Sequence, residues 1–183
     1  MKKLGILVGK RGRGSNMGAI VRACHSGELP AVVEWVASTG ADAPAFDLAR
    51  GLGLATRALP SAEDVLTLPP VDFICLAGFL SLVPASVIQA YRGRILNIHP
   101  ALLPKFGGPG MYGIRVHKAV LEAGETTTGC TVHWVTEQYD EGPILLQRSC
   151  PVESTDTPET LAARVLKEEH LAYVEALRIA LAD

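Results

Sequence analysis

The sequence lacks the features that mark metal-dependent, membrane-spanning and nucleic-acid-binding proteins. Its four cysteines form no C-x-x-C pair, no H-E-x-x-H occurs, and His25, His133 and His170 lack metal-ligand spacing, so we expect no bound metal. Widely spaced cysteines in apolar segments are typical of a reducing setting, which predicts a cytoplasmic protein. No apolar run is long enough to cross a membrane, and a net charge of −2 gives no field that gathers nucleic acid. Small molecules are therefore the expected partners, with no nucleic acid and no membrane.

The chain has the size and apolar content of one folded unit. Its 183 residues are 48% hydrophobic and 20% charged, which is enough for a sizeable core. No linker or internal repeat divides the sequence. We therefore expect a single domain that comprises residues 1–183.

Short apolar runs alternate with amphipathic stretches through the first two thirds of the chain. The runs show almost no polar alternation, which is typical of strands buried on both faces of a parallel sheet. Helices that connect such strands cross over the sheet and cover its faces. The predicted strands are 4–8, 32–38, 73–77 and 95–99, and the predicted helices are 17–25, 44–52, 84–91 and 114–123.

The last third of the chain follows a different pattern. Residues 128–136 alternate more clearly, 139–143 have turn chemistry and 144–150 form another apolar run, which predicts an antiparallel strand pair. Thr157, followed by proline, is typical of a helix cap, and the amphipathic stretch after it continues to about Leu181. The predicted fold class is α/β, with a doubly wound, mostly parallel, Rossmann-like sheet, an antiparallel C-terminal strand pair and a long C-terminal helix.

A glycine-rich turn between the first strand and the first helix is the first candidate site. It has the sequence Gly-Lys-Arg-Gly-Arg-Gly-Ser-Asn over residues 9–16. Free backbone N–H groups and the helix dipole favour a phosphate there, and the basic residues suit an anion. Such turns also serve only close strand–helix packing, with Ser15 or Asn16 as a helix cap, so the turn alone leaves both interpretations open.

Two polar side chains at the end of a buried strand form the second candidate. Asn97 and His99 are two residues apart, so strand geometry places them on the same face. An amide donor beside an imidazole can hold a carbonyl whose oxygen becomes negative as an amine attacks it. The spacing equally allows Asn97 to satisfy a backbone group and His99 to end a strand before proline.

Two loops supply further candidates. Asp140 lies in a turn, where an aspartate most often caps its own backbone. Brought close to His99, its carboxylate would orient the ring and help to pass protons from the attacking amine to the leaving nitrogen. The glycine-rich segment 106–113 fits either a lid beside the strand end or a plain connection to the next helix.

Four segments carry a resemblance to a known family. They are Gly-Arg-Gly-Ser-Asn at 12–16, Leu-Ala-Gly-Phe at 76–79, Asn-Ile-His-Pro-Ala-Leu-Leu-Pro-Lys at 97–105 and Val-Thr-Glu-Gln-Tyr-Asp-Glu-Gly-Pro-Ile at 135–144. Over nearly its whole length, the chain resembles the formyltetrahydrofolate-dependent formyltransferases, and among them the phosphoribosylglycinamide formyltransferases. The Asn-x-His-Pro block with its downstream aspartate is the specific part of this resemblance.

The resemblance implies direct transfer of a formyl group from 10-formyltetrahydrofolate, as co-substrate, to the amine of glycinamide ribonucleotide in purine biosynthesis. Asn97 and protonated His99 would stabilise the tetrahedral oxyanion, and Asp140 would hold His99 and assist proton movement through water. Without the resemblance, Glu169 would be expected on a solvated helix face. The resemblance assigns the substrate phosphate to Gly12, Gly14, Ser15 and Asn16, the amine to Glu169, and the folate to Leu80, Leu82, Val83 and Tyr139.

The chain departs from the family pattern at four places. Lys10-Arg11 looks like an insertion, segment 59–71 is short, Ser81 stands where many relatives carry an arginine, and Arg115 stands where a histidine is common. Two alternatives stay open: another formyltetrahydrofolate-dependent reaction, with a different amine or with hydrolysis, and a non-catalytic nucleotide-binding module. The sequence does not decide between a monomer and a homodimer.

Overall fold

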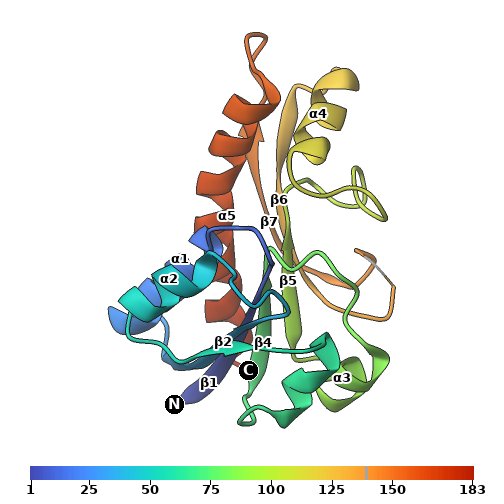
Figure 1. Ribbon diagram of the computed structural model, residues 1–183. Helices are drawn as coiled ribbons and strands as arrows, with labels where there is room; N and C mark the ends of the chain where they lie inside the picture. The colour runs from blue at the N-terminus through green and yellow to red at the C-terminus, as the bar shows by residue number, and fades with distance from the viewer. Residues whose placement is uncertain (139) are drawn as a thin grey trace.

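The computed structural model describes residues 1–138 and 140–183, which build a seven-stranded sheet with helices around it (Figure 1). The strands are β1 Lys2–Val8, β2 Ala31–Ser38, β3 Thr56–Ala58, β4 Phe73–Ala77, β5 Ile95–His99, β6 Thr127–Trp134 and β7 Ile144–Pro151. The helices are α1 Ser15–His25, α2 Ala45–Gly51, the 3₁₀ helix η1 Ala62–Thr67, α3 Ala85–Ala90, α4 Ile114–Glu122 and α5 Pro158–Leu181. The strand order is β3-β2-β1-β4-β5-β6-β7, parallel from β3 to β5 and antiparallel for the pairs of β5 with β6 and β6 with β7.

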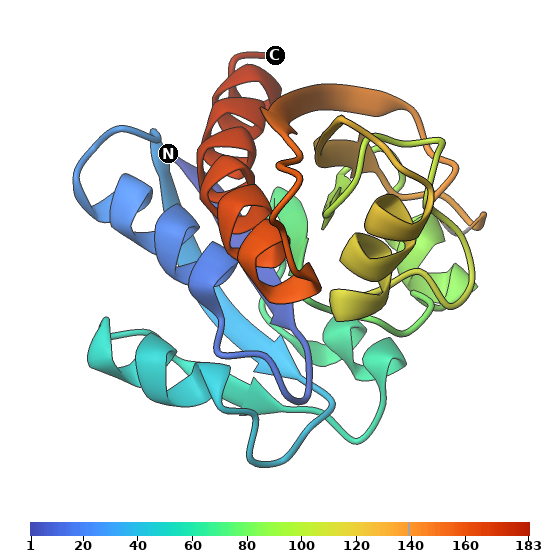
Figure 2. The same ribbon diagram turned by 90° about the horizontal axis from the view of Figure 1, so that it is seen from above.

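Helices cover both faces of the sheet, as a comparison of Figure 1 with Figure 2 shows. On one face, α1 and α5 pack against each other and enclose a core with Leu4, Ile6 and Val8 of β1. On the other face, Leu7 of β1 packs in a second core with Val65 of η1. Both faces of β1 are therefore apolar, which explains why its sequence shows no polar alternation. The predicted α/β fold class, with its antiparallel strand pair and long C-terminal helix, is confirmed.

The predicted elements are all present, and their ends differ from the prediction by at most two residues. The sequence patterns did not predict β3 or η1. β3 has three residues, which is too short to show a period, and η1 has six. η1 begins with a capping box, in which the Ser61 backbone N–H donates to the Asp64 carboxylate over 3.0 Å. The short segment 59–71 thus keeps a helical turn.

Helix α5 forms hydrogen bonds to the sheet at the place where β4 and β5 separate. Thr157 caps this 24-residue helix, because its side-chain oxygen accepts the Thr160 backbone N–H over 3.2 Å. The buried Tyr173 hydroxyl lies 2.8 Å from the Leu76 carbonyl oxygen of β4 and 3.1 Å from the Leu96 carbonyl oxygen of β5. β4 and β5 pair over only two residues each, so Tyr173 joins them just before their ends diverge. In the described parts of the chain, no helix has both the length and the apolar character needed to cross a membrane.

Candidate active site

A cavity of about 430 Å³ opens at the carboxyl ends of the parallel strands. Its walls come from the turn after β1, the segment after β4, the end of β5, the glycine-rich segment and α5. The strand order reverses direction between β1 and β4, and open α/β sheets bind ligands at such a switch point. Asn97, His99, Asp140 and Glu169 all line this cavity. The structure therefore brings together the three predicted catalytic residues and Glu169, the residue predicted to bind the amine.

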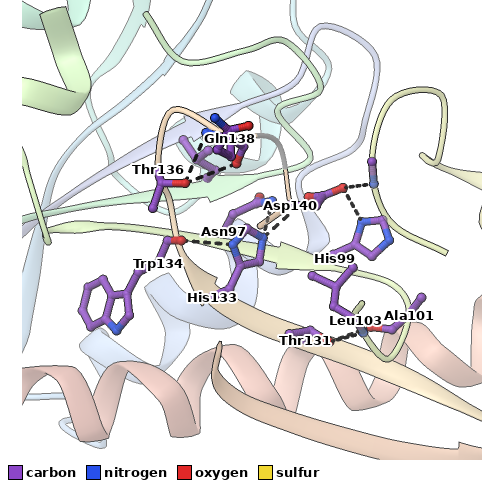
Figure 3. Close-up of polar contacts among 12 residues, drawn as sticks. Asn97, His99, Ala101, Leu103, Thr131, His133, Trp134, Thr136, Gln138 and Asp140 are labelled. Atoms are coloured by element: carbon purple, nitrogen blue, oxygen red, sulfur yellow. Dashed lines mark hydrogen bonds and ion pairs between the residues drawn. The ribbon is translucent and has the colours of Figure 1, made fainter. Parts of the chain in front are cut away.

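Asn97 is held by a histidine on the neighbouring strand. Asn97 lies opposite His133 in the ladder of β5 and β6, and Asn97 Nδ2 is 3.2 Å from His133 Nε2 (Figure 3). His133 Nδ1 is 3.2 Å from the Trp134 carbonyl oxygen, and because this oxygen can only accept, Nδ1 carries the ring proton. Nε2 is therefore unprotonated and accepts the Asn97 amide N–H. Burial lowers the pKa of His133 below its ordinary value, which favours this neutral form. One amide N–H of Asn97 is thus used by His133, and the other can donate to a ligand in the cavity.

The two ring nitrogens of His99 have different surroundings. Nε2 is 2.7 Å from the Phe106 carbonyl oxygen, so Nε2 carries a proton and donates it to this hydrogen bond. Nδ1 faces Asp140, with 3.6 Å between Nδ1 and Oδ2. The side chain is buried at the end of β5. Because the backbone occupies Nε2, Nδ1 is the nitrogen that can reach a substrate.

Asp140 contacts both histidines. Its Oδ1 is 3.6 Å from His133 Nε2, and its Oδ2 is 3.6 Å from His99 Nδ1 and accepts the Gly108 backbone N–H over 3.1 Å (Figure 3). The side chain is 4% exposed, so water screens this charge little. The backbone of Asp140 has φ 56, a left-handed conformation that asparagine and aspartate tolerate better than most residues. The turn thus aims a buried carboxylate at two imidazoles, while the catalytic roles of these residues stay a prediction.

The glycine-rich segment 106–113 is tied to these side chains. It supplies the Phe106 carbonyl that binds His99 and the Gly108 N–H that binds Asp140. Met111 and Tyr112 line the cavity farther along the same segment. The segment is therefore more than a plain connection, because it holds the His99 ring and the Asp140 carboxylate in place.

Thr131 supports the loop that follows His99. Its hydroxyl donates to the Ala101 carbonyl over 2.7 Å and accepts the Leu103 backbone N–H over 3.0 Å. Gln147 of β7 also donates to this hydroxyl oxygen, over 3.0 Å. Thr131 lies opposite His99 in the ladder and is fully buried. It fixes the course of the chain from Ala101 to Leu103, directly after His99.

The first turn presents an open helix start to the cavity. Gly14 is the N-cap residue of α1, no side chain caps the helix there, and the first turn holds no acidic residue. Gly14 has φ 81, and a Cβ on it would lie 2.7 Å from Ala45 Cβ, so only glycine fits. Uncapped N–H groups and the helix dipole favour an anion. Of the four residues predicted to bind the phosphate, Gly12 and Asn16 line the cavity, and Gly14 and Ser15 lie between them in the chain.

Glu169 of α5 and Asn16 of α1 also line the cavity. Asn16 Nδ2 donates to Glu169 Oε1 over 3.1 Å, and Asn16 Oδ1 is buried with no partner among the described residues. Glu169 is 8% exposed, and burial raises its pKa to about 7 although the Asn16 hydrogen bond lowers it. The pair therefore offers acceptor oxygens that suit the N–H groups of an amine. Because the Asn16 side chain is used here, a phosphate would meet its backbone N–H instead.

The predicted folate residues lie around two adjoining hollows. Leu82 and Val83 line a small hollow of about 40 Å³ that also contains Asn97 and His133. Leu80 lines the main cavity instead. Leu80 and Leu82 are 53% and 65% exposed, which leaves apolar surface along this segment. Tyr139, the fourth predicted folate residue, lies outside the described residues.

Three residues of the site were not predicted. His133 and Thr131 alternate along β6, and an antiparallel partner strand places them opposite Asn97 and His99, so the register of this pair is the signal that would have found them. His117 of α4 lines the cavity, and its buried Nδ1 has no partner among the described residues. Burial and the nearby His99 lower the pKa of His117. A lone histidine in an amphipathic helix gives no sequence signal for such a position.

The arrangement is suited to hydrogen bonding and proton transfer around a carbonyl group. The cavity brings together the free amide N–H of Asn97, the Nδ1 of His99 and the acceptor oxygens of Glu169 and Asn16. Within residues 1–138 and 140–183, no group of three or more histidine, cysteine, aspartate or glutamate side chains could hold a metal ion. The four cysteines are free thiols.

Comparisons with known proteins point to one family. A family model described as "Formyl transferase" matches residues 4–177. The chain is 45% identical over 189 residues to the chloroplastic phosphoribosylglycinamide formyltransferase of Arabidopsis thaliana, with 96% of this chain and 64% of that protein covered. It therefore spans less than two thirds of this plant relative. It is 37% identical over 182 residues to phosphoribosylglycinamide formyltransferase of Escherichia coli (strain K12), with 93% and 84% covered.

The solved structures include glycinamide ribonucleotide transformylase 1 from Symbiobacterium toebii. Its TM-score with this structure is 0.89 at 40% sequence identity, with 97% of this chain and 86% of that chain covered. Such a score over nearly the whole chain means that the sheet order and the covering helices agree. The similarity therefore extends to the elements that surround the cavity.

Proposed function

The chain belongs to the formyl transferase family, and from this premise we propose that it transfers the formyl group of 10-formyltetrahydrofolate to the amine of glycinamide ribonucleotide, a step of purine biosynthesis. The observation that carries the proposal is the convergence of Asn97, His99 and Asp140 on one cavity that also holds a buried carboxylate. The relatives whose names state this activity share 37–45% of their aligned residues with the chain.

The oxyanion side of the reaction is assigned to Asn97 and His99. As the amine nitrogen attacks the formyl carbon, the carbonyl oxygen becomes an oxyanion. This oxyanion accepts one hydrogen bond from the free amide N–H of Asn97 and one from the protonated Nδ1 of His99. His133 keeps the Asn97 amide turned so that its nitrogen points into the site. The Asp140 carboxylate, 3.6 Å from Nδ1, stabilises the imidazolium by its charge.

Collapse of the tetrahedral intermediate completes the transfer. The bond between the formyl carbon and the folate nitrogen breaks, the oxygen becomes a carbonyl again, and the leaving nitrogen takes up one proton. The attacking amine loses one proton, so the overall change is balanced. Asp140 is placed to assist this transfer through water, because it lies beside both imidazoles.

The amine substrate is assigned to the opposite side of the cavity. The Glu169 carboxylate and the unpartnered Asn16 Oδ1 accept N–H groups of the amine, and the open start of α1 accepts the phosphate. The folate ring is assigned to the hollow lined by Leu82 and Val83, with Leu80 next along the path. At about 40 Å³ this hollow is narrow for a bicyclic ring, so binding requires it to widen.

The same assignments indicate the domain organisation, the type of substrate and the compartment in which the protein acts. We propose that residues 1–183 act as a single formyltransferase domain on small-molecule substrates in the cytoplasm. The uncapped, glycine-rich phosphate site and the buried acceptors fit a phosphorylated amine of modest size. The four free thiols are consistent with a reducing compartment.

The test is an assay of the purified protein with 10-formyltetrahydrofolate and a panel of acceptors. Release of deformylated folate should require glycinamide ribonucleotide and should be far slower with other amines or with water. Asn97→Ala should remove turnover while its circular dichroism spectrum stays native. Release at the same rate without an acceptor would show a hydrolase, and preference for another amine would correct the acceptor. No release under any condition would support a binding module.

A further inference from the structure

We propose that Phe106 is a positioning residue for His99, and that its carbonyl selects which nitrogen of the ring carries the exchangeable proton. This inference deepens the proposed function and rests on it, because it assumes that His99 Nδ1 serves the reacting carbonyl group. The contact that carries it is the 2.7 Å separation between the Phe106 carbonyl oxygen and His99 Nε2. The backbone and the side chain of Phe106 both explain why this oxygen points at the ring.

The backbone of Phe106 has a conformation that phenylalanine rarely adopts. Its φ is 57°, and in residues 1–138 and 140–183 the only other non-glycine residue with a positive φ is Asp140. Aspartate tolerates this left-handed region, whereas a bulky side chain is an outlier there and persists only where the surrounding structure enforces it. Both residues bring an oxygen to the His99 ring. The unfavourable conformations thus lie where the chain approaches His99.

The Phe106 side chain anchors this conformation. It is half-buried and packs against the core that α1 and α5 enclose, whereas the nearby Lys105 and Pro109 are exposed. Lys105 Nζ is 3.0 Å from Glu125 Oε1, which fixes the chain just before the ring. Burial of an aromatic ring offsets the cost of a left-handed backbone. The core contacts of Phe106 therefore hold its carbonyl in place.

The next two residues are glycines that contact Asp140. A Cβ on Gly107 would lie 2.4 Å from Leu103 Cδ2 and 3.5 Å from Asp140 Cβ, so the chain passes directly beside this side chain. Gly108 has φ 90° and donates its backbone N–H to Asp140 Oδ2 over 3.1 Å. Residues 106–108 thus bind the imidazole through a carbonyl and the carboxylate through an N–H, and they set the 3.6 Å separation between His99 Nδ1 and Asp140 Oδ2.

This geometry determines where the exchangeable proton of His99 resides. A carbonyl oxygen can only accept, so Nε2 keeps its proton in both the neutral and the charged ring. The second proton is then gained and lost at Nδ1, beside Asp140. Burial lowers the pKa values of His117 and His133, so these nearby rings add no competing positive charge. Without the Phe106 carbonyl, the neutral ring could keep its single proton on Nδ1, next to the carboxylate, and Nδ1 would exchange no proton with the reacting group.

The experiment replaces Phe106 by glycine and by leucine. Glycine adopts a positive φ at little cost but has no side chain to anchor, so the carbonyl can turn away from His99. Phe106→Gly should lower kcat about 10-fold, the effect of losing one hydrogen bond to a charged group, and should change the KM values of both substrates by less than about 2-fold. Phe106→Leu keeps an apolar anchor and should recover most of this loss. Leu52→Ala is the matched control, because Leu52 packs against the same core and does not line the cavity.

The tautomer of His99 gives a second readout that needs no substrate. Nitrogen-15 spectra of the histidine rings at alkaline pH should show the neutral His99 ring of the unmodified protein protonated at Nε2 alone. Phe106→Gly should show a mixture of the two tautomers. Leu52→Ala should keep the single tautomer and the normal kcat although its melting temperature falls. The His99 signals are identified by their loss from the spectrum of His99→Gln.

Each outcome decides the proposal. A single tautomer protonated at Nε2 in Phe106→Gly would overturn it, and so would a mixture of tautomers with a normal kcat. Equal losses of kcat in Phe106→Gly and Leu52→Ala would show a merely structural role and would also overturn it. Loss of kcat together with a mixed tautomer, both reversed in Phe106→Leu, would support it. Failure of the proposed function is distinct, because the unmodified protein would then leave the amine unformylated, whereas the spectra would still report the tautomer.

Discussion

Replacing Glu169 by glutamine should stabilise the protein at alkaline pH while weakening its use of the amine. Burial raises the pKa of Glu169 from its ordinary 4.5 to about 7. Below pH 4.5 this side chain is neutral in both the folded and the unfolded protein, so ionisation favours neither state. As the pH rises toward 7, the unfolded chain ionises and the folded protein does not, so the folded protein loses stability.

The magnitude follows from the difference between these two pKa values. At about 1.36 kcal/mol for each pKa unit, the difference between 4.5 and about 7 corresponds to about 3 kcal/mol, fully developed by about pH 8. Glutamine has no charge to lose, and its side-chain oxygen can still accept the Asn16 amide N–H. Most of the advantage of Glu169→Gln should therefore appear between pH 5 and pH 8. For a chain of this size, it corresponds to a melting temperature about 5–10 °C higher at pH 8.

The assay is thermal and urea unfolding of both proteins at pH 5 and pH 8, together with the KM for the amine. Glu122→Gln is the control, because Glu122 is exposed on α4 and its substitution should change stability equally little at both pH values. A stability difference between Glu169→Gln and the unmodified protein that does not vary with pH would refute the reasoning. So would a Glu169→Gln variant that keeps the normal KM for the amine, since the buried charge would then have no function.

Three other changes test the remaining parts of the structure. Asp140→Asn should lower kcat about 10²–10⁴-fold with an unchanged melting temperature, because the amide cannot stabilise an imidazolium; a loss below 3-fold would contradict this. Tyr173→Phe should reduce the free energy of unfolding by about 1–3 kcal/mol, measured in urea, because two buried carbonyls lose their hydroxyl partner; unchanged stability would place their hydrogen bonds elsewhere. Gly14→Ala should raise the KM for the phosphorylated amine and lower the melting temperature, whereas Gly12→Ala, with open space around it, should lower the melting temperature far less.

The sheet and its long helices could be predicted because their signals are local. Strands buried on both faces give unbroken apolar runs, and Thr157 with the following proline marks the start of α5. β3 could not be predicted, because its three residues take their conformation from pairing with β2 rather than from their own pattern. Local sequence thus determines the frame, and short elements depend on their neighbours.

The site was predictable in part for a similar reason. Asn97 and His99 share a strand, so their common face follows from the strand period. The approach of Asp140 depends on the course of a loop, and the role of His133 depends on the register between β5 and β6, which no single-strand pattern contains. Glu169 was expected to face solvent, because glutamate side chains are usually exposed. Its spacing of four residues from both Val165 and Tyr173 nevertheless places it on the buried stripe of α5.

Helix α5 carries Glu169 and Tyr173 one turn apart, so a single segment supplies both a buried carboxylate of the cavity and the link between β4 and β5. β4 and β5 end at Ala77 and His99, whereas α5 begins only at Pro158, so both strands are synthesised well before this helix. A nascent chain therefore displays Asn97 and His99 while the wall facing them is still missing. A chain that stops before α5 would lack both the buried carboxylate and the link between β4 and β5, so the same segment completes the cavity and the sheet.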